Sequence, residues 1–236
     1  MTSSVLLVEN LDSGYGRVQV LFNVSIRVDP GETIGIIGPN GAGKTTLVRS
    51  IMGFIKPWRG KVFYMGRDIT LLKPYEKIRL GIGYCPERGG VLRTLSVDDN
   101  IGLVLAVKKT SREKLDFVEK LFPILRERRK QVAGTLSGGE QRMIAVAKAL
   151  LLAENLLILD EPSAGLAPIL KKRLAERLLE IKRKENISML ITEQDPYLVK
   201  AVADRVYVME RGVIAKKGST DEVLKEEVLR EHYLGI

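Results

Sequence analysis

The stretch Gly38-Pro-Asn-Gly-Ala-Gly-Lys-Thr-Thr46 comes directly after the apolar run Thr33-Ile-Gly-Ile-Ile37. A buried strand, a glycine-rich turn and a helix that begins near Lys44 are the parts of a P-loop, in which backbone N–H groups surround a phosphate. The positive end of the helix dipole strengthens that attraction. A glycine-rich turn that only caps a helix requires no lysine or threonine after its last glycine, so we predict a phosphate-binding loop.

The residue types of this loop also predict its ligand. Lys44 is suited to reach the β- and γ-phosphates of a nucleoside triphosphate, and the Thr45 hydroxyl is suited to ligate Mg²⁺. The residues expected to bind the nucleotide are Gly38, Pro39, Asn40, Gly41, Ala42, Gly43, Lys44, Thr45 and Thr46. The expected ligand is therefore a nucleoside triphosphate with magnesium.

The composition is that of a globular protein. The chain has 236 residues, of which 45% are apolar, and no apolar run approaches the length of a bilayer span. Its formal net charge of +9 favours anionic partners, although each short basic cluster also suits a solvated helix face. Cys85 is the one cysteine, so no internal disulfide can form, and we expect a small buried side chain there. Without a signal peptide at the N-terminus, a cytoplasmic location is expected.

The apolar pattern predicts one folded unit over residues 1–236, without an internal repeat or linker. Strands are expected over residues 5–11, 24–28, 33–37, 61–64, 67–69, 83–85, 156–159, 188–192, 206–209 and 213–215. Helices are expected from residue 44 to the glycine at 53, over 74–79, 97–107, 111–122, 137–151 and 168–184, from 196, and after the capping-box spacing at 219–222. Pro123 is expected to break the helical stretch. Residues 88–153 therefore read as a helical subdomain within an α/β sheet.

An acidic pair follows one of the buried strands, where Leu156-Leu-Ile-Leu159 ends in Asp160-Glu161. An acid at a strand end can support Mg²⁺, and the next carboxylate can accept a proton from an attacking water. We therefore expect Asp160 to bind the metal together with Thr45, and Glu161 to be the general base. A P-loop alone would also fit a kinase, a GTPase or a motor protein.

The stretch Leu136-Ser-Gly-Gly-Glu-Gln141 distinguishes these classes. Ser137 and Glu140 have the spacing of a capping box, which begins a helix, and the two glycines between them let a phosphate approach the exposed amides. With the P-loop before it and the acidic pair after it, this stretch resembles the signature of ABC-type ATPases. Essentially the whole chain is similar to a nucleotide-binding subunit of that family.

The resemblance implies a P-loop NTPase fold of the ABC ATPase type: a mixed-sheet α/β core, an antiparallel β region and a helical subdomain. It implies ATP and Mg²⁺ as cofactors and a head-to-tail dimer, in which the signature of one subunit faces the ATP of the other. The signature residues that act on the second subunit are Leu136, Ser137, Gly138, Gly139, Glu140 and Gln141. Tyr15 corresponds to an aromatic residue that stacks on adenine, and residues 163–166 correspond to a loop that crosses the dimer interface.

Two positions depart from the family's commonest pattern. Glu87, in Pro86-Glu87, stands where most members carry a glutamine, so a carboxylate would face Mg²⁺ or the attacking water. Gln194 stands where most carry a histidine, and it can donate a hydrogen bond to a γ-phosphate oxygen but carries no charge. The only histidine is His232. We therefore expect hydrolysis to survive without a histidine-like pH dependence.

With Pro-Glu at residues 86–87 and Glu-Gln at residues 193–194, the chain resembles one subgroup, the second ATPase of branched-chain amino acid import systems. Its further features are Ser-x-Gly-Leu-Ala-Pro at residues 163–168 and Tyr-Leu-Gly at residues 233–235. That subgroup usually has Gly-Arg after Pro-Glu, whereas this chain has Arg88-Gly89-Gly90, so urea or short amides are alternative cargoes.

The resemblance implies an ATPase that energises a membrane importer from the inner face of the membrane. The expected partners are separate membrane-spanning permease subunits, a second ABC ATPase or a second copy of this chain, and an extracellular or periplasmic substrate-binding protein. A soluble ABC ATPase acting on nucleic acid or ribosomes is the alternative from another class. Nucleic acid is not expected as a partner, because residues 88–136 show no sustained heptads and the chain has one P-loop.

Overall fold

Two β-sheets form the centre of the structure, a computed structural model that describes residues 4–225. The larger sheet has the strand order β10-β9-β3-β8-β7-β6. Its strands are β3 (Thr33–Ile37), β6 (Ile82–Cys85), β7 (Leu156–Asp160), β8 (Ser188–Glu193), β9 (Arg205–Glu210) and β10 (Val213–Ser219). The pairs among β6, β7, β8, β3 and β9 are parallel, and β10 is antiparallel to β9. The predicted mixed sheet is confirmed.

The smaller sheet has the order β2-β1-β4-β5 and is antiparallel. Its strands are β1 (Leu6–Tyr15), β2 (Val18–Val28), β4 (Arg59–Tyr64) and β5 (Arg67–Asp68). The sequence prediction ended the first strand too early, because Tyr15 is the last residue of β1 and not part of a loop. The pairing of β1 with β2 continues past the apolar residues through several register shifts, and Asn10 has a positive φ of 48°. Apolar alternation therefore stops before the strand does.

The helices follow the predicted order. They are α1 (Lys44–Met52), α2 (Pro74–Arg79), α3 (Val97–Val107), α4 (Arg112–Leu121), α5 (Ile124–Glu127), α6 (Gly138–Leu152), α7 (Pro168–Glu185), α8 (Pro196–Val202) and α9 (Thr220–Val223), with a 3-10 turn at Ala133–Thr135. Pro123 separates α4 from α5, as predicted. The sequence pattern missed α5, because four residues are too few to show a helical period.

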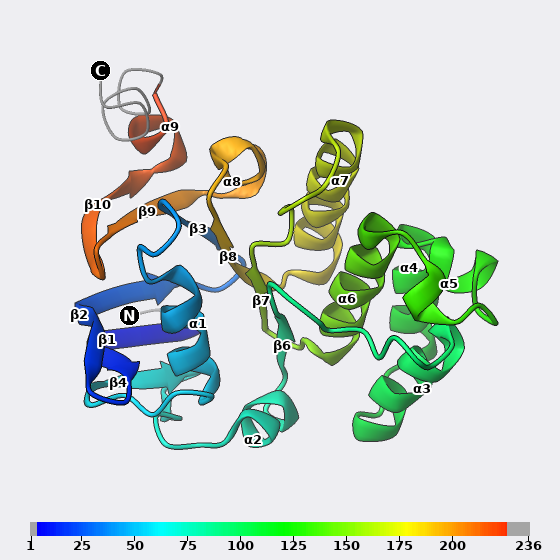
Figure 1. Cartoon of the computed structure of the whole chain (residues 1–236), viewed down its shortest axis with the longest axis horizontal. Helices are drawn as coiled ribbons and strands as arrows, with labels where there is room; N and C mark the ends of the chain where they lie inside the picture. Colours follow the sequence, from blue (N-terminus) through cyan, green and yellow to red (C-terminus); the bar gives the residue numbers. More distant parts are fainter. Residues whose placement is uncertain (1–3, 226–236) are drawn as a thin grey trace.

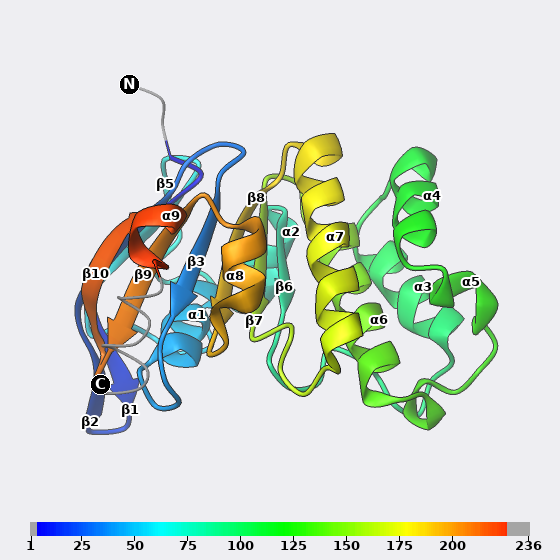
Figure 2. The same ribbon diagram turned by 90° about the horizontal axis from the view of Figure 1, so that it is seen from above.

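The helices divide between the faces of the larger sheet. Helix α1 contacts strands of both sheets, and its apolar residues Leu47, Val48, Ile51 and Met52 are buried with the strands of the smaller sheet. Helices α6, α7 and α8 share a second apolar cluster with the opposite face of the larger sheet, where Cys85 is also buried. Figures 1 and 2 show α3, α4 and α5 beyond α6, on the side away from the smaller sheet.

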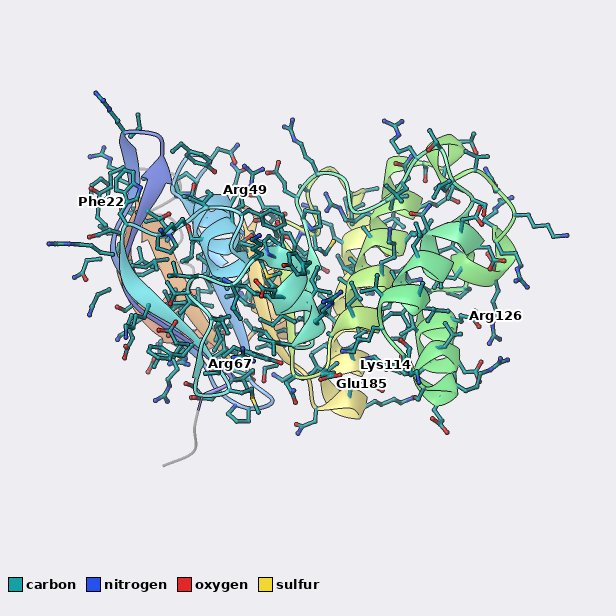
Figure 3. The ribbon with its side chains drawn as sticks, turned by 90° about the horizontal axis from the view of Figure 1, so that it is seen from below. Phe22, Arg49, Arg67, Lys114, Arg126 and Glu185 are labelled. Carbon is teal, nitrogen blue, oxygen red and sulfur yellow. The ribbon has the colours of Figure 1, made fainter. Side chains whose placement is uncertain are left out.

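Two lysines attach the outer helices to the end of α6. The ammonium of Lys108 donates to Leu152 O at 2.8 Å, and that of Lys114 donates to Ala153 O. The last carbonyls of a helix carry partial negative charge, so ammonium groups stabilise this end. Lys114 lies beside Glu185, the last residue of α7 (Figure 3), and burial lowers the pKa of Lys114. These contacts join α3 and α4 to the helices that pack on the sheet.

Candidate active site

The predicted P-loop connects β3 to α1, which begins at Lys44 as expected. At Gly38 a Cβ atom would lie 2.2 Å from Met209 O, so no other residue fits there without a shift of the backbone. Gly43 has a φ of 109°, which side chains other than glycine rarely permit, and α1 has no side-chain cap at its N-terminus. The first N–H groups of α1 are therefore suited to an anion such as a phosphate.

Lys44 lies over its own loop, with a side chain that is only 4% exposed. Its ammonium donates to Gly38 O at 2.8 Å and to Pro39 O at 3.1 Å, and it pairs with Glu161 Oε1 at 3.0 Å. The structure thus brings together the predicted phosphate-binding lysine and the predicted general base. A negative phosphate and the Glu161 carboxylate would compete for the same ammonium group.

Asp160 and Thr45 form the group of atoms that could hold a metal ion. Thr45 Oγ1 donates to Asp160 Oδ1 at 3.3 Å. Oδ2 of Asp160 is buried and has no hydrogen-bond partner within residues 4–225, and burial raises the pKa of this carboxyl. A buried carboxylate oxygen without a partner is costly unless a cation or a donor approaches it. These oxygens fit Mg²⁺, which typically takes one or two protein carboxylates and completes its shell with phosphate oxygens and waters.

Glu161 follows β7 in the left-handed backbone region, with a φ of 45°. This conformation costs free energy in a residue other than glycine, so surrounding contacts must hold it. Its backbone N–H donates to Thr192 O at 3.0 Å and to Thr192 Oγ1 at 3.1 Å, at the end of β8. The Thr192 hydroxyl in turn donates to Asp160 Oδ1 at 2.7 Å. The end of β8 therefore holds both residues of the acidic pair.

The two residues that depart from the family pattern come from different loops, Glu87 after β6 and Gln194 after β8. Gln194 is exposed and lines a pocket of about 380 Å³ together with Glu161. The Glu87 carboxylate pairs with Arg88 at 3.4 Å, and its negative charge is among the causes that raise the pKa of Asp160. Gln194 is thus next to the predicted base, and Glu87 is near the predicted metal site while paired with its neighbour.

Tyr15 lies beside the helix that follows the P-loop. Its hydroxyl accepts from Arg49 at 3.4 Å and from Thr46 Oγ1 at 3.5 Å, and Figure 3 labels Arg49 on α1. The residue remains 45% exposed, so a flat ligand can reach the ring. That this ring stacks on a base stays a prediction.

The predicted signature begins α6, as its capping box implied. Ser137 Oγ accepts from Glu140 N at 3.3 Å, and the Glu140 carboxylate accepts from Ser137 N at 2.8 Å. The Ser137 hydroxyl also donates to the Glu140 carboxylate at 2.7 Å, and this hydrogen bond, together with the one from Ser137 N, lowers the pKa of Glu140. Gly138 is exposed, and nothing lies within 4 Å of the place where its Cβ would be. In Figures 1 and 2 strands β7 and β8 lie between α6 and α1, so this chain does not bring its signature to its own P-loop.

Sequence reasoning missed three residues that support the site: Thr192, Glu193 and Arg142. The first two are polar and buried at the end of β8, after the apolar run Met189-Leu-Ile191. Two polar residues at the end of a fully buried strand are the sequence pattern that could have pointed to Thr192 and Glu193 as site residues. No sequence pattern pointed to Arg142, because basic residues are common on the solvent-facing side of an amphipathic helix.

Arg142 connects the signature helix to the loop that carries Glu87. Its guanidinium donates to Pro86 O at 2.8 Å and to Glu87 O. We expect Arg142→Ala to lower the free energy of unfolding by about 2 kcal/mol, because two carbonyls lose a charged donor. Urea denaturation at neutral pH measures the loss. The control is Arg112→Ala, since Arg112 is 83% exposed, and equal midpoints for the two variants would contradict the bracing role.

A model of the ABC transporter family matches residues 21–164, which include both the P-loop and the signature. The chain belongs to the ABC transporter family. The branched-chain amino acid transport ATP-binding protein BraG of Pseudomonas aeruginosa is 36% identical over 98% of this chain and 100% of that protein. The lipopolysaccharide export system ATP-binding protein LptB of Acidithiobacillus ferridurans is 35% identical over 99% and 98%.

The fold agrees with that of solved members of the family. The ATP-binding cassette MJ1267 in its ADP conformation has a TM-score of 0.82 and 32% identity, and the match covers 100% of both chains. This chain is therefore an ATP-binding subunit of an ABC transporter, with an α/β P-loop NTPase fold, and it resembles the ATP-binding proteins of branched-chain amino acid transport. No helix within residues 4–225 is both long and apolar enough to cross a membrane. The Tyr-Leu-Gly stretch at residues 233–235, which contributed to the subgroup resemblance, and His232 lie outside the described residues.

Proposed function

We propose that this ABC subunit hydrolyses ATP with magnesium and thereby energises a membrane importer for branched-chain amino acids. The observation that carries the proposal is the meeting of Lys44, Glu161 and Asp160 at one end of the sheet, in a chain that matches BraG over its whole length. The P-loop would bind the phosphates, and Thr45 with Asp160 would hold Mg²⁺, which neutralises charge on the phosphates when bound.

In this proposal Glu161 accepts the proton of the attacking water. A carboxylate within 3.0 Å of the Lys44 ammonium is near the place where the phosphates would bind. Gln194, in the same pocket, would donate a hydrogen bond to the γ-phosphate. The exposed Gly138 and Ser137 would serve the ATP of a second ATPase subunit, which explains why the sheet separates them from the P-loop of this chain.

The partners follow from the same proposal. Separate permease subunits would cross the membrane, and the helical region at residues 88–153 with the Glu87 loop would pass motion to them. A second ATPase would complete the dimer, with the chain peripheral on the inner face of the membrane, and a substrate-binding protein would deliver the cargo. Because LptB is as similar to this chain as BraG is, overall identity does not separate import from export. The Glu87 and Gln194 pattern favours the branched-chain amino acid class.

Purification of the tagged chain from detergent-solubilised native membranes tests this function. We expect it to be recovered with two multi-span proteins and a second ATPase, and the ATPase activity of the reconstituted complex to rise with a binding protein loaded with leucine. Stimulation by a binding protein loaded with urea or a short amide would instead assign that compound as the cargo. Recovery with lipopolysaccharide export components, or only from the soluble fraction with ribosomes or nucleic acid, would overturn the importer.

A further inference from the structure

Glu193 is a buried carboxylate that the proposed chemistry does not yet use. It is the last residue of β8 and is 2% exposed. Its Oε1 accepts a hydrogen bond from the backbone N–H of Ser163 at 2.8 Å. Burying a carboxylate costs free energy unless donors compensate it. We therefore expect the Glu193 carboxylate to have a role that an apolar side chain could not fill.

Ser163 is a buried residue in the loop after β7, between Glu161 and an exposed turn. It is 1% exposed, whereas Ala164 and Gly165, directly after it, are exposed. Hydrogen bonds from Ala164 N to Glu161 O at 3.2 Å and from Leu166 N to Ser163 O at 3.1 Å form the turn. A force that holds the Ser163 backbone therefore restrains Glu161 on one side and the exposed tip on the other.

The neighbour of Glu193 completes this restraint. Thr192 accepts the backbone N–H of Glu161 and donates to Asp160, as described above. Consecutive residues of β8 thus hold consecutive parts of the loop after β7: Thr192 holds the acidic pair, and Glu193 holds Ser163. Rigid strands position reactive groups more precisely than loops do, and displacements near 1 Å can cost about 100-fold in rate.

We propose that Glu193 is a positioning residue for hydrolysis: as a carboxylate it holds the Ser163 backbone, and so fixes both Glu161 and the exposed tip at residues 164–165. This role rests on the proposed ATPase function. It assigns Glu193 no contact with ATP and no proton transfer, so its loss should affect turnover and not nucleotide binding.

The charged groups around Glu193 give this role a pH dependence. Burial raises the pKa of Glu193 to about 7, and the nearby Glu161 carboxylate adds to the rise. The Ser163 hydroxyl, the Ser163 backbone N–H and the Lys171 ammonium act in the opposite direction. Lys171 is on α7 and pairs with Asp195, which precedes α8. Above pH 7 the carboxylate is charged and binds the Ser163 N–H strongly. Below it the group is protonated and that hydrogen bond weakens.

The sequence predicted little histidine-like pH dependence, because Gln194 stands in place of a histidine, and Glu193 adds a different titrating group. We now expect kcat of the wild-type protein to fall several-fold between pH 8 and pH 6, as Glu193 binds a proton. The KM for ATP should change by less than about twofold, because Glu193 lies outside the P-loop.

The test compares Glu193→Gln, Glu193→Ala and wild type in the full chain, purified in complex with its second ATPase and permease partners. Glu193→Gln keeps the shape and an acceptor oxygen, so we expect a kcat reduced several-fold at pH 8 and nearly constant from pH 6 to 8. Glu193→Ala removes the acceptor, and we expect kcat to fall about 10- to 100-fold with an unchanged KM. The control is Glu180→Gln, because the Glu180 side chain on α7 is 40% exposed and pairs with Lys184.

Amide hydrogen exchange gives a readout of position that does not depend on activity. We expect faster exchange over residues 161–166 in Glu193→Ala than in wild type. An active wild type whose kcat and pH profile are unchanged by Glu193→Gln would overturn the role of Glu193 alone. A wild-type complex with its second ATPase that binds ATP and does not hydrolyse it would overturn the proposed function and this role with it.

Discussion

Glu161→Gln is expected to lower the rate of ATP hydrolysis by about 100-fold or more, the usual contribution of a general base. The amide keeps the shape of the side chain but cannot accept the proton of water. Because Glu161 also pairs with Lys44 at 3.0 Å, the substitution frees the ammonium group for the phosphates. We therefore expect ATP affinity to stay the same or to increase, and the ATP-bound dimer to accumulate.

Steady-state hydrolysis, calorimetric titration with ATP and size-exclusion chromatography measure these three effects. Glu180→Gln is the matched control, because the Glu180 side chain is 40% exposed and pairs with Lys184 on the same helix. Turnover equal to that of wild type would remove Glu161 from the role of base. Weaker ATP binding by Glu161→Gln would contradict the competition between this carboxylate and the phosphates for Lys44.

Lys44→Met is expected to weaken ATP binding by about 10- to 100-fold, because hydrogen bonds to charged groups contribute roughly 1.5–3 kcal/mol. Methionine has a similar length and fills the same space without charge. In the structure the ammonium contacts Gly38 O, Pro39 O and Glu161, so the variant also leaves a largely buried carboxylate without its cation. Both effects act against phosphate binding at this loop.

Isothermal titration with ATP in the presence of Mg²⁺ measures the change in Kd. Lys61→Met is the control, since Lys61 is 62% exposed and its pairing with Asp68 spans 3.7 Å. An affinity of Lys44→Met within twofold of wild type would show that the backbone amides of the loop bind the phosphates without the lysine.

The local parts of the site were predictable because each is specified by neighbouring residues. The P-loop needs glycines at positions such as Gly43, with its φ of 109°, and a lysine directly after them. The capping box of Ser137 and Glu140 needs a spacing of three residues, and the structure contains it. The acidic pair needs a buried strand before it, which β7 supplies. The amino-acid sequence by itself therefore determined the fold family, the nucleotide loop and the signature helix.

The contacts between distant segments were decided by the tertiary structure alone. Sheet order places β8 beside both β3 and β7, and only that adjacency brings Thr192 and Glu193 to the loop that carries Glu161. The packing of α6 on β6 likewise brings Arg142 to the Glu87 loop, 55 residues away in the chain. Hydrogen-bond partners across a parallel sheet leave no periodic pattern in the sequence, since they depend on register and burial. For the same reason the raised pKa of Glu193 follows from its enclosure by other elements and not from its neighbours in the chain.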